Sequence, residues 1–435
     1  MSDISPLRRR QRICVVGSGA AALAAAWRLS RRHAVTIFEK NAHLGGHANT
    51  VVVPAPDGAA IAVDTGFIVY NQRTYPKLIA MFDRLGVPTQ ATDMSFGVSL
   101  DQGRLEYSGG SLGGLFGQPT NLIRPRFLGM IADVLRFYRE APRLMTETGP
   151  GPSLGDYLRR NHYGRAFVED HLLPMAAAIW SAPAETMMDF PAISFIRFCS
   201  NHGLLQLVDR PQWRTVTGGS REYVRRLIAD TEAAEIRLNT AVVQIARRPD
   251  EVEVTTADGQ RAVFDQVVIG AHADEALALL ADPGAGERSV LGAFSYQENL
   301  ALLHGDVTLM PRRRRVWSAW NYLGQAGPDG SRRLCVTYWM NRLQSLDPRL
   351  PLFVTLNPIT TPRDDSVHAR IVYHHPVFDA SAMEAQERLP LIQGHRRTWF
   401  CGSYFGYGFH EDAFSSGLSL AEAMGGVVLT AEPAA

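Results

Sequence analysis

The spacing of hydrophobic and polar positions changes several times along the chain, most clearly in its first forty residues. Residues 12–16 (RICVV) form a short apolar run, which predicts a buried strand. Residues 23–30 (LAAAWRLS) have helical spacing, and residues 34–38 (AVTIF) form a second apolar run. This order predicts a strand–turn–helix–strand unit that belongs to a parallel sheet.

A glycine-rich turn, residues 17–22 (GSGAAA), joins the first expected strand to the helix. Gly17 permits a tight turn, Gly19 lets the backbone approach a pyrophosphate, and Ala22 allows close packing of the helix on the strand. The free N–H groups of the first helical turn, which includes Ala21, and its positive dipole end favour phosphate. The turn therefore predicts a bound dinucleotide.

The residues after the second expected strand narrow the choice of dinucleotide. Glu39 lies about twenty residues after the turn, where a carboxylate accepts ribose hydroxyls and disfavours the 2′-phosphate of NADP. Lys40 follows, and Gly45 and Gly46 provide a second close approach to a diphosphate. This stretch resembles the signature of glutathione-reductase-like flavoproteins, and within them the amine oxidase, protoporphyrinogen oxidase and phytoene desaturase superfamily. His47 replaces the usual arginine. The resemblance implies non-covalently bound FAD.

Two later segments resemble further parts of the same superfamily. Residues 63–71 (VDTGFIVYN), which include Thr65 and Gly66, resemble the loop near the flavin ring. Residues 236–245 (IRLNTAVVQI) resemble the strand whose valine touches the adenine, and Val243 is the matching residue. The resemblance thus implies that both segments bind the cofactor.

The C-terminal region provides the most specific match. Residues 398–402 (TWFCG) form a strand-like run that ends at Gly402, and the turn 408–413 (GFHEDA) and an expected helix 418–424 follow. This order resembles the closing motif of the superfamily, in which a helix N-terminus faces the flavin N1–C2=O edge and stabilises the anionic reduced ring. The resemblance implies cofactor contacts for four residues: His410, Glu411, Asp412 and Ala413.

These segments predict an α/β protein with two interleaved domains. A Rossmann-like, glutathione-reductase-like FAD-binding domain is expected from residues 1–85, 205–290 and 390–428. An α+β substrate domain that contains a mixed sheet is expected from residues 86–204 and 291–389. Helical spacing dominates the first insertion, for example at 127–138, whereas β-branched and aromatic runs dominate the second, at 300–303, 315–322 and 334–340.

Composition excludes several classes of partner. The formal net charge of +1 gives no electrostatic preference for nucleic acid. The thirteen histidines are dispersed and the four cysteines form no CxxC pair, so no metal site is expected. The chain has two lysines, Lys40 and Lys77, and therefore carries nearly all its positive charge on arginine.

Two basic segments bear on localisation. Arginines before residue 13 and the apolar stretch after it resemble a signal peptide, but cleavage would remove the glycine-rich turn, so we expect a cytoplasmic protein. Residues 122–143 alternate apolar residues with arginines, which fits either an ordinary packed helix or peripheral contact with a membrane. Residues 312–315 (RRRR) form a second basic cluster, which fits either a solvated turn or contact with phospholipid headgroups.

Catalytic candidates come from the two segments expected near the flavin ring. Tyr70, Tyr407 and His410 are the candidates. His410 can accept a proton, with Tyr407 or Glu411 as the group that orients it; alternatively His410 only hydrogen-bonds flavin or backbone. No lysine occurs in the late, strand-rich insertion, where the related amine oxidases carry one, and this weighs against amine oxidation.

The whole pattern resembles a bacterial family of predicted NAD/FAD-binding, amine-oxidase-like proteins associated with cyclopropane and methyl-branched fatty acid synthases, one branch of which is implicated in furan fatty acid formation. The resemblance implies a lipid substrate. Our leading hypothesis is an FAD-dependent oxidoreductase that desaturates a lipid acyl chain, such as a methylated unsaturated fatty acyl phospholipid, by hydride transfer to flavin N5. The alternatives are a flavin amine or porphyrinogen-type oxidase, and a non-catalytic flavin-binding partner of a lipid-modifying enzyme.

Overall fold

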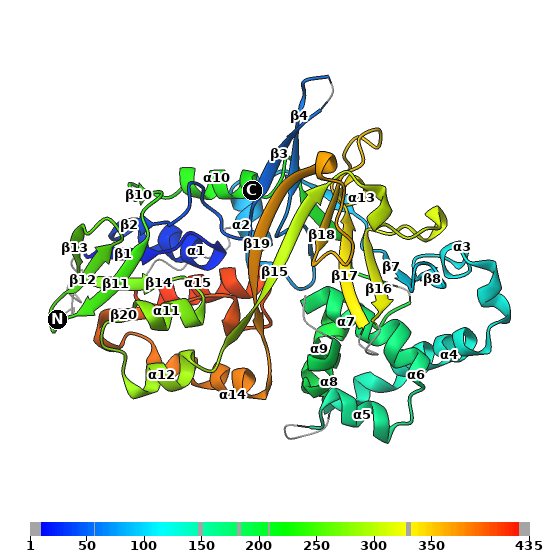
Figure 1. The fold of residues 1–435 in the computed structure, drawn as a ribbon. Coiled ribbons are helices and arrows are strands. Elements are labelled where there is room, and N and C mark those ends of the chain that lie inside the picture. Colours follow the sequence, from blue (N-terminus) through cyan, green and yellow to red (C-terminus); the bar gives the residue numbers. More distant parts are fainter. Residues whose placement is uncertain are drawn as a thin grey trace, which may run out of the picture.

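Two large sheets organise the computed structural model, which describes residues 10–55, 57–146, 151–180, 184–207, 209–327 and 332–425. The arginines at positions 8 and 9, and residues 426–428 of the expected cofactor domain, lie outside these residues. A parallel sheet and a mixed sheet lie side by side, and the long strands β15 (Ser295–His304) and β19 (Val367–Val377) form the side of the mixed sheet that faces the parallel sheet (Figure 1).

The parallel sheet contains the expected strand–turn–helix–strand unit. Its order is β10-β2-β1-β14-β20, and its strands are β1 (Arg12–Val16), β2 (Ala34–Phe38), β10 (Glu235–Arg237), β14 (Gln266–Ile269) and β20 (Thr398–Phe400). Ile13 and Val15 pack in one core, and Cys14 and Val16 pack in another on the opposite face. Both faces are covered, which explains why β1 is a continuous apolar run rather than an alternating one.

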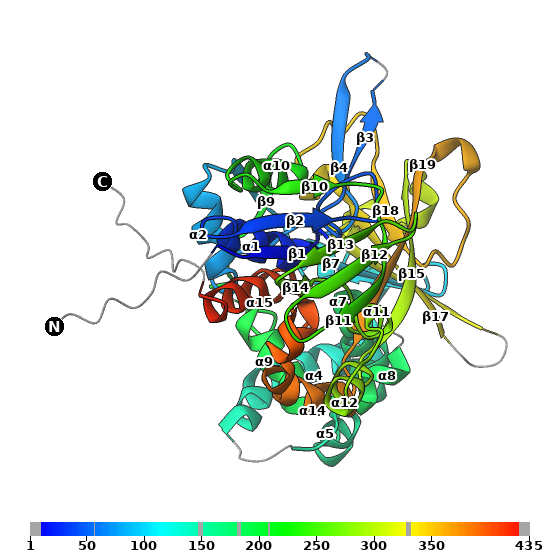
Figure 2. The same cartoon turned by 90° about the vertical axis from the view of Figure 1, so that its left-hand side faces the viewer.

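Helices far apart in the sequence cover one face of this sheet. α1 (Ala20–Leu29) and α15 (His410–Ala423) pack together there (Figure 2). The remaining helices of the two cores are α2 (Pro76–Arg84), α10 (Arg221–Ala229), α11 (Ala273–Leu279), α12 (Ala285–Leu291) and α14 (Ala380–Arg388). The C-terminal segment thus completes the layer that the N-terminal segment begins.

The C-terminal helix begins earlier than the sequence predicted. We expected a turn at 408–413 and a helix from residue 418, but α15 begins at His410 and runs through Gly417. A Cβ atom on Gly417 would lie 2.0 Å from the Ala21 carbonyl oxygen, so this glycine is a packing residue inside the helix. The expectation was wrong because a glycine that allows close helix packing resembles one that ends a helix.

The expected strand 236–245 is also divided. β10 ends at Arg237 and β11 begins at Val242, with Asn239 in the left-handed region at φ 52° between them. β11 (Val242–Arg247), β12 (Val252–Thr256) and β13 (Arg261–Phe264) form a separate antiparallel sheet. The apolar run was misread because it spans the end of one sheet and the start of another.

The mixed sheet has the strand order β19-β15-β18-β17-β16-β7-β8. Besides β15 and β19, its strands are β7 (Phe96–Leu100), β8 (Leu105–Ser108), β16 (Trp320–Ala326), β17 (Arg332–Trp339) and β18 (Phe353–Leu356). The first insertion, which the sequence predicted as helical, therefore also supplies two strands of this sheet, β7 and β8. The expected strand 315–322 starts late, because residues 314–316 form a 3₁₀ turn.

Short strands connect the two large sheets. β3 (Thr50–Pro54) and β4 (Ala60–Asp64) form a hairpin, and β9 (Trp213–Val216) lies between β5 (Tyr70–Asn71) and β6 (Thr89–Thr92). A helical layer packs against the mixed sheet, and its helices are α3 (Leu112–Leu115), α4 (Pro125–Glu140), α5 (Leu154–Arg160), α6 (Arg165–Phe167), α7 (Leu173–Trp180), α8 (Ala184–Asp189) and α9 (Ala192–Asn201). The short helix α13 (Met340–Leu343) follows β17. No helix within the described residues is long and apolar enough to cross a membrane.

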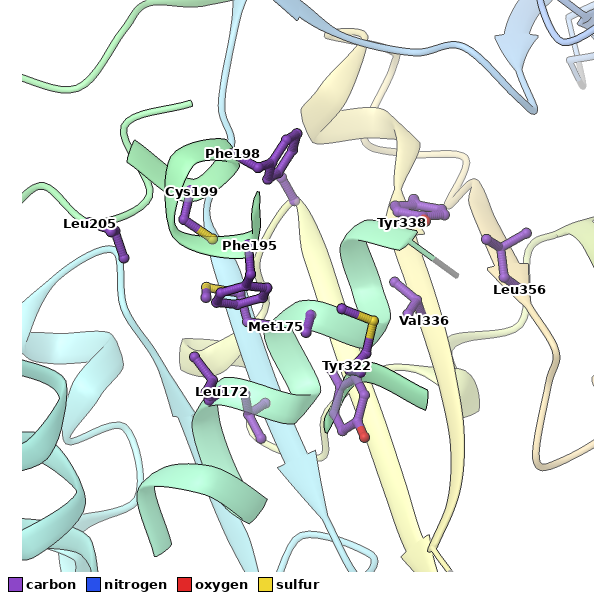
Figure 3. Close-up of a cluster of buried hydrophobic side chains, with 14 of the residues drawn as sticks. Leu172, Met175, Phe195, Phe198, Cys199, Leu205, Tyr322, Val336, Tyr338 and Leu356 are labelled. Atoms are coloured by element: carbon purple, nitrogen blue, oxygen red, sulfur yellow. The ribbon is translucent and has the colours of Figure 1, made fainter. Parts of the chain in front are cut away.

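The helical layer and the mixed sheet share the largest apolar core. Phe195 and Phe198 of α9 and Met175 of α7 lie close to Val336 and Tyr338 of β17 (Figure 3). All five side chains are at most 7% exposed. This core borders the elements that carry the C-terminal motif, because Tyr407 and Phe409 pack against it.

Candidate cofactor and active site

The glycine-rich turn has the geometry that a pyrophosphate needs. Gly17 has φ 91°, and its N–H donates to the Phe38 carbonyl oxygen at 2.8 Å. Gly19 precedes α1, and a Cβ atom placed on it would meet nothing within 4 Å. Gly270 approaches Ala22 so closely that its own Cβ would lie 2.6 Å from the Ala22 Cβ. The turn is therefore tightly packed behind Gly17 and Ala22 and open in front of Gly19.

Glu39 is fixed at the end of β2. It is 5% exposed, and the Ser18 hydroxyl donates to its Oε2 at 2.5 Å. The backbone and side-chain N–H groups of Asn41 donate to Oε1 at 2.8 and 2.9 Å. Sequence analysis identified Glu39 but missed Ser18 and Asn41. The only sequence features that could have indicated them are the position of Ser18 in the glycine-rich turn and that of Asn41 shortly after β2.

The second glycine pair lies against the first turn. Gly19 and Gly45 form an isolated parallel bridge, and a Cβ atom on Gly46 would lie 3.1 Å from the Gly19 Cα. Gly45 and Gly46 have φ 112° and 58°, conformations that other residues rarely adopt. Both glycine motifs thus meet where the sequence predicted a diphosphate.

His47 lies in a cluster of rings. Its ring centroid is 4.8 Å from that of Tyr373, 5.4 Å from that of His375 and 6.3 Å from that of His272. Burial, followed by the neighbouring histidines, lowers the pKa of His47 well below its usual value. Its Nε2 is buried without a hydrogen-bond partner among the described residues. His47 can therefore offer a cofactor a hydrogen bond but not the charge of the arginine it replaces.

Thr65 and Gly66 pack against this same turn. The Thr65 hydroxyl lies 2.8 Å from the Tyr373 hydroxyl, and a Cβ atom on Gly66 would lie 2.2 Å from the His47 carbonyl oxygen. The residue before them, Asp64, accepts hydrogen bonds from Thr50, from Ser220 and from the Gln344 side chain. Burial raises the pKa of Asp64 to about 6. These contacts connect residues 63–71, which we call the flavin loop, to α10 and to the segment after α13.

Two residues that we expected to contact the cofactor, Lys40 and Val243, are exposed to solvent. Lys40 points to the surface and its Nζ pairs with Glu275 Oε1 at 2.8 Å, so the cofactor contact expected at this position stays a prediction. Val243 lies at a register shift in β11 and is 50% exposed. An exposed valine at an irregular strand position is available to an adenine ring, because a bulge redirects the side chain.

The four C-terminal motif residues form the first turn of α15, after Gly402. Asp412 Oδ2 accepts hydrogen bonds from the Tyr407 and Phe409 N–H groups, both at 2.9 Å, and burial raises its pKa to about 6. Asp412 therefore stabilises the turn in which the superfamily commonly has glycine. Ala413 is buried at 9% exposure, and the Gly402 N–H donates to Ser416 Oγ at 3.0 Å.

Glu411 does not orient His410. Its carboxylate accepts the N–H groups of Lys77 and Leu78, at 2.9 and 3.0 Å, at the start of α2. His410 instead has Tyr223 as its partner, with 2.5 Å between His410 Nε2 and the Tyr223 hydroxyl oxygen. The expectation that Tyr407 or Glu411 orients His410 was therefore wrong. Sequence analysis could not identify Tyr223, because it is far from His410 in the sequence.

His410 is an uncharged imidazole. It stacks on Phe67 with ring centroids 3.9 Å apart and planes 12° apart. Burial lowers the pKa of His410 to about 3, and its position at the positive end of α15 acts in the same direction. His410 therefore has a lone pair available at neutral pH.

The other two catalytic candidates, Tyr70 and Tyr407, lie in different parts of the structure. Tyr70 is 3% exposed and packs against Tyr75 and Phe82 in the core between the parallel sheet and α1, so the structure places it as a packing residue. Tyr407 lies at the border of the helical core, with its ring centroid 6.2 Å from that of Phe198. The structure therefore brings Tyr407 and His410 into one segment and leaves Tyr70 outside it.

Aromatic side chains pack beside the segment that carries Tyr407 and His410. Phe198 stacks on Phe409 at 4.7 Å and on His202 at 3.9 Å, and the ring of Trp213 lies 6.2 Å from that of His202. Burial lowers the pKa of His202 to about 4, so this side chain is also uncharged at neutral pH. Sequence reasoning missed this group, since its members come from α9, β9 and the C-terminal turn.

The residues present fit FAD. Gly19 and the paired glycines leave room for a diphosphate, the Glu39 carboxylate ends β2, Val243 is exposed, and the N-terminus of α15 adjoins the flavin loop through His410 and Phe67.

Comparisons with known proteins agree with this geometry. The fold is similar to a fatty acid isomerase from P. acnes (TM-score 0.65, 17% identity, covering 95% of this chain and 98% of the other). It is also similar to cyclohexylamine oxidase from Brevibacterium oxydans (0.66, 12%, 96% and 99%) and to putrescine oxidase bound to putrescine (0.64, 15%, 96% and 99%). A comparison with curated protein sequences gives no match.

The family model described as flavin containing amine oxidoreductase matches residues 21–304, well over half of the chain. This span includes the second glycine pair, the flavin loop and β11, all of which adjoin the proposed cofactor position. The chain therefore belongs to the flavin containing amine oxidoreductase family and is an FAD-dependent oxidoreductase.

Proposed function

We propose that this oxidoreductase desaturates the acyl chain of a lipid, such as a methylated unsaturated fatty acyl phospholipid. The observation that carries the proposal is the apolar wall beside the C-terminal motif. Tyr407 and Phe409 pack against the core between the helical layer and the mixed sheet, and Phe198 stacks on Phe409. Such a wall offers an acyl chain dispersion contacts and a water-poor site.

The placement of the lysines supports a substrate other than an amine. Residues 291–389 contain no lysine, Lys40 is ion-paired at the surface, and Lys77 is exposed at the start of α2. The fold itself accommodates both chemistries, since its relatives include a fatty acid isomerase and amine oxidases. The family match favours amine oxidation as the second candidate, and porphyrinogen-type oxidation stays beside it as an alternative.

Bound FAD supplies a hydride acceptor. Desaturation removes a hydride from one carbon and a proton from its neighbour, and the two remaining electrons form the new C=C bond. The protein must align the allylic C–H bond and receive the proton. His410 is the proposed proton acceptor, because its imidazole is uncharged, and Tyr223 positions it through the 2.5 Å contact.

Anaerobic flavin reduction tests this proposal. The holoenzyme is mixed with a methylated unsaturated phospholipid, or with a panel of amines, and flavin absorbance is followed. We expect bleaching with the phospholipid. Bleaching with amines alone would favour the second candidate. An unreactive flavin in a protein that co-purifies with a lipid-modifying enzyme would favour a non-catalytic partner.

Variants separate the two proposed roles. We expect His410→Gln to slow reduction at least about 100-fold and Tyr223→Phe about tenfold, with FAD affinity nearly unchanged. Tyr107→Phe is the matched control, because it also removes a buried hydroxyl, which donates to the Asp170 carbonyl oxygen at 2.7 Å in the helical layer. If all three variants reduce the rate equally, His410 and Tyr223 have no specific part in proton transfer.

A further inference from the structure

The outer side of α4 carries exposed apolar side chains as well as arginines. Phe127, Met130, Val134 and Phe137 turn inward to the helical core. Leu128 and Leu135, seven residues apart and therefore on one side of the helix, point outward and are 45% and 47% exposed. A surface helix normally exposes polar residues on its outer side, so this orientation calls for a partner.

The apolar face continues into the 3₁₀ turn before α4. Leu122 and Ile123 end this turn, Pro119–Ile123, and are 55% and 80% exposed. We call the exposed side chains of Leu122, Ile123, Leu128 and Leu135 the α4 face. It lies at the end of the molecule formed by α3 and α4, away from the parallel sheet (Figure 1).

The fold joins the two basic clusters beside this face. Arg124 Nη1 donates to the Arg104 carbonyl oxygen at 2.8 Å, and Arg313 Nη1 donates to the neighbouring Gly103 carbonyl oxygen at 3.0 Å. The turn between β7 and β8 therefore connects two arginine groups that are almost two hundred residues apart in the sequence.

Much of this positive charge is not neutralised. Arg312, Arg314 and Arg315 are exposed, and neither they nor Arg124 form an ion pair with a carboxylate in the described part of the chain. An exposed apolar band beside uncompensated arginines matches the chemistry of an anionic bilayer surface, where leucine enters the acyl boundary and arginine binds phosphate. We propose that the α4 face and these arginines dock the protein on an anionic phospholipid membrane, whichever substrate the flavin oxidises.

Vesicle binding tests the docking surface. The holoenzyme is sedimented with vesicles of phosphatidylcholine alone or mixed with phosphatidylglycerol. We expect binding to the mixed vesicles only, and weaker binding at high salt, because salt screens exposed charges. Absence of binding to phosphatidylglycerol vesicles overturns the proposal.

Matched variants locate the surface. We expect the Arg312→Gln/Arg314→Gln/Arg315→Gln triple variant to bind the mixed vesicles roughly 100-fold more weakly, and Leu128→Ser/Leu135→Ser at least about tenfold more weakly. The charge control is Arg261→Gln/Arg349→Gln/Arg370→Gln, and the apolar control is Leu391→Ser, which alters a side chain 69% exposed elsewhere.

Both controls should bind as the unchanged protein does, with flavin absorbance intact in every variant. Equal losses in variants and controls overturn the proposal. A dimer that the leucine variants dissociate, with unchanged vesicle binding, also overturns it, because a second copy would then cover the face.

Discussion

Two glycines in contact with α1 serve physically different purposes. Gly19 faces open space, and its backbone, at φ −64° and ψ 171°, suits any residue. Gly417 packs so closely on α1 that an added Cβ would lie 2.0 Å from the Ala21 carbonyl oxygen. Gly19 therefore keeps space free for a ligand, whereas Gly417 allows two helices to touch.

Alanine substitutions distinguish these purposes. We expect Gly19→Ala to weaken FAD binding at least about tenfold while changing the unfolding free energy of the apoprotein by less than about 1 kcal/mol. Gly417→Ala should lower the unfolding free energy by about 3 kcal/mol through overpacking. Fluorescence titration with FAD and urea unfolding of the apoprotein measure the two effects. A large loss of apoprotein stability in Gly19→Ala would contradict this division.

At this scale, local spacing predicted what depends on the local backbone. Gly17, Gly45 and Gly46 could be assigned because each needs a conformation at positive φ that few residues adopt. Tyr223 and Phe67, the neighbours of His410, could not be assigned, because no local signal marks a side chain whose partner lies in another segment.

At the scale of elements, Glu411 joins two helices. Its carboxylate accepts two N–H groups at the start of α2, although it belongs to the first turn of α15. The desolvated carboxyl has a raised pKa, which these hydrogen bonds partly offset. The N-terminus of α2 thus depends on a residue more than three hundred positions away.

Glu411→Ala tests whether this role is structural. We expect the unfolding free energy to fall by about 1–2 kcal/mol, the usual cost of losing a helix cap, and FAD affinity to change by less than about threefold. Faster hydrogen exchange at Lys77 and Leu78 would locate the loss in α2. A large loss of FAD affinity without faster local exchange would instead support the predicted cofactor contact of Glu411.

Element boundaries show what sequence patterns can and cannot resolve. The predictions for β1 and β2 were confirmed, since each is a short apolar run with polar or glycine limits. The start of α15 was missed because Ser416 and Gly417 look like a helix break, although tertiary packing keeps them helical. The spacing of apolar residues indicates which positions are buried. It does not identify the neighbouring element that buries them.

At the scale of the molecule, interleaving is visible in the sequence, but the contacts that join the parts are not. Asp64 of the flavin loop accepts a hydrogen bond from the Gln344 side chain at 3.0 Å, although 280 residues separate them. The two basic clusters likewise meet through the β7–β8 turn. The proposed domain boundaries remain a prediction, since only unfolding or proteolysis of separate parts tests them.

Buried histidines should make the whole molecule acid-labile. Burial lowers the pKa of four histidines to about 4 and of His410 to about 3, and the four are His171, His202, His304 and His375. Below pH about 6.5 the unfolded chain binds protons that the folded chain excludes, so stability falls from there toward pH 4. Three carboxyls act oppositely, because burial raises the pKa of Asp64 and Asp412 to about 6 and that of Glu411 above its usual value, but they are fewer.

We therefore expect the unfolding free energy to fall between pH 6 and pH 5 by at least about 1.4 kcal/mol, the slope of one net proton. Urea unfolding in excess FAD across this range measures it. His202→Phe keeps a ring against Phe198 and should reduce the slope by about one proton. Stability that rises or stays level on acidification would show that the carboxyls with raised pKa values outweigh the histidines.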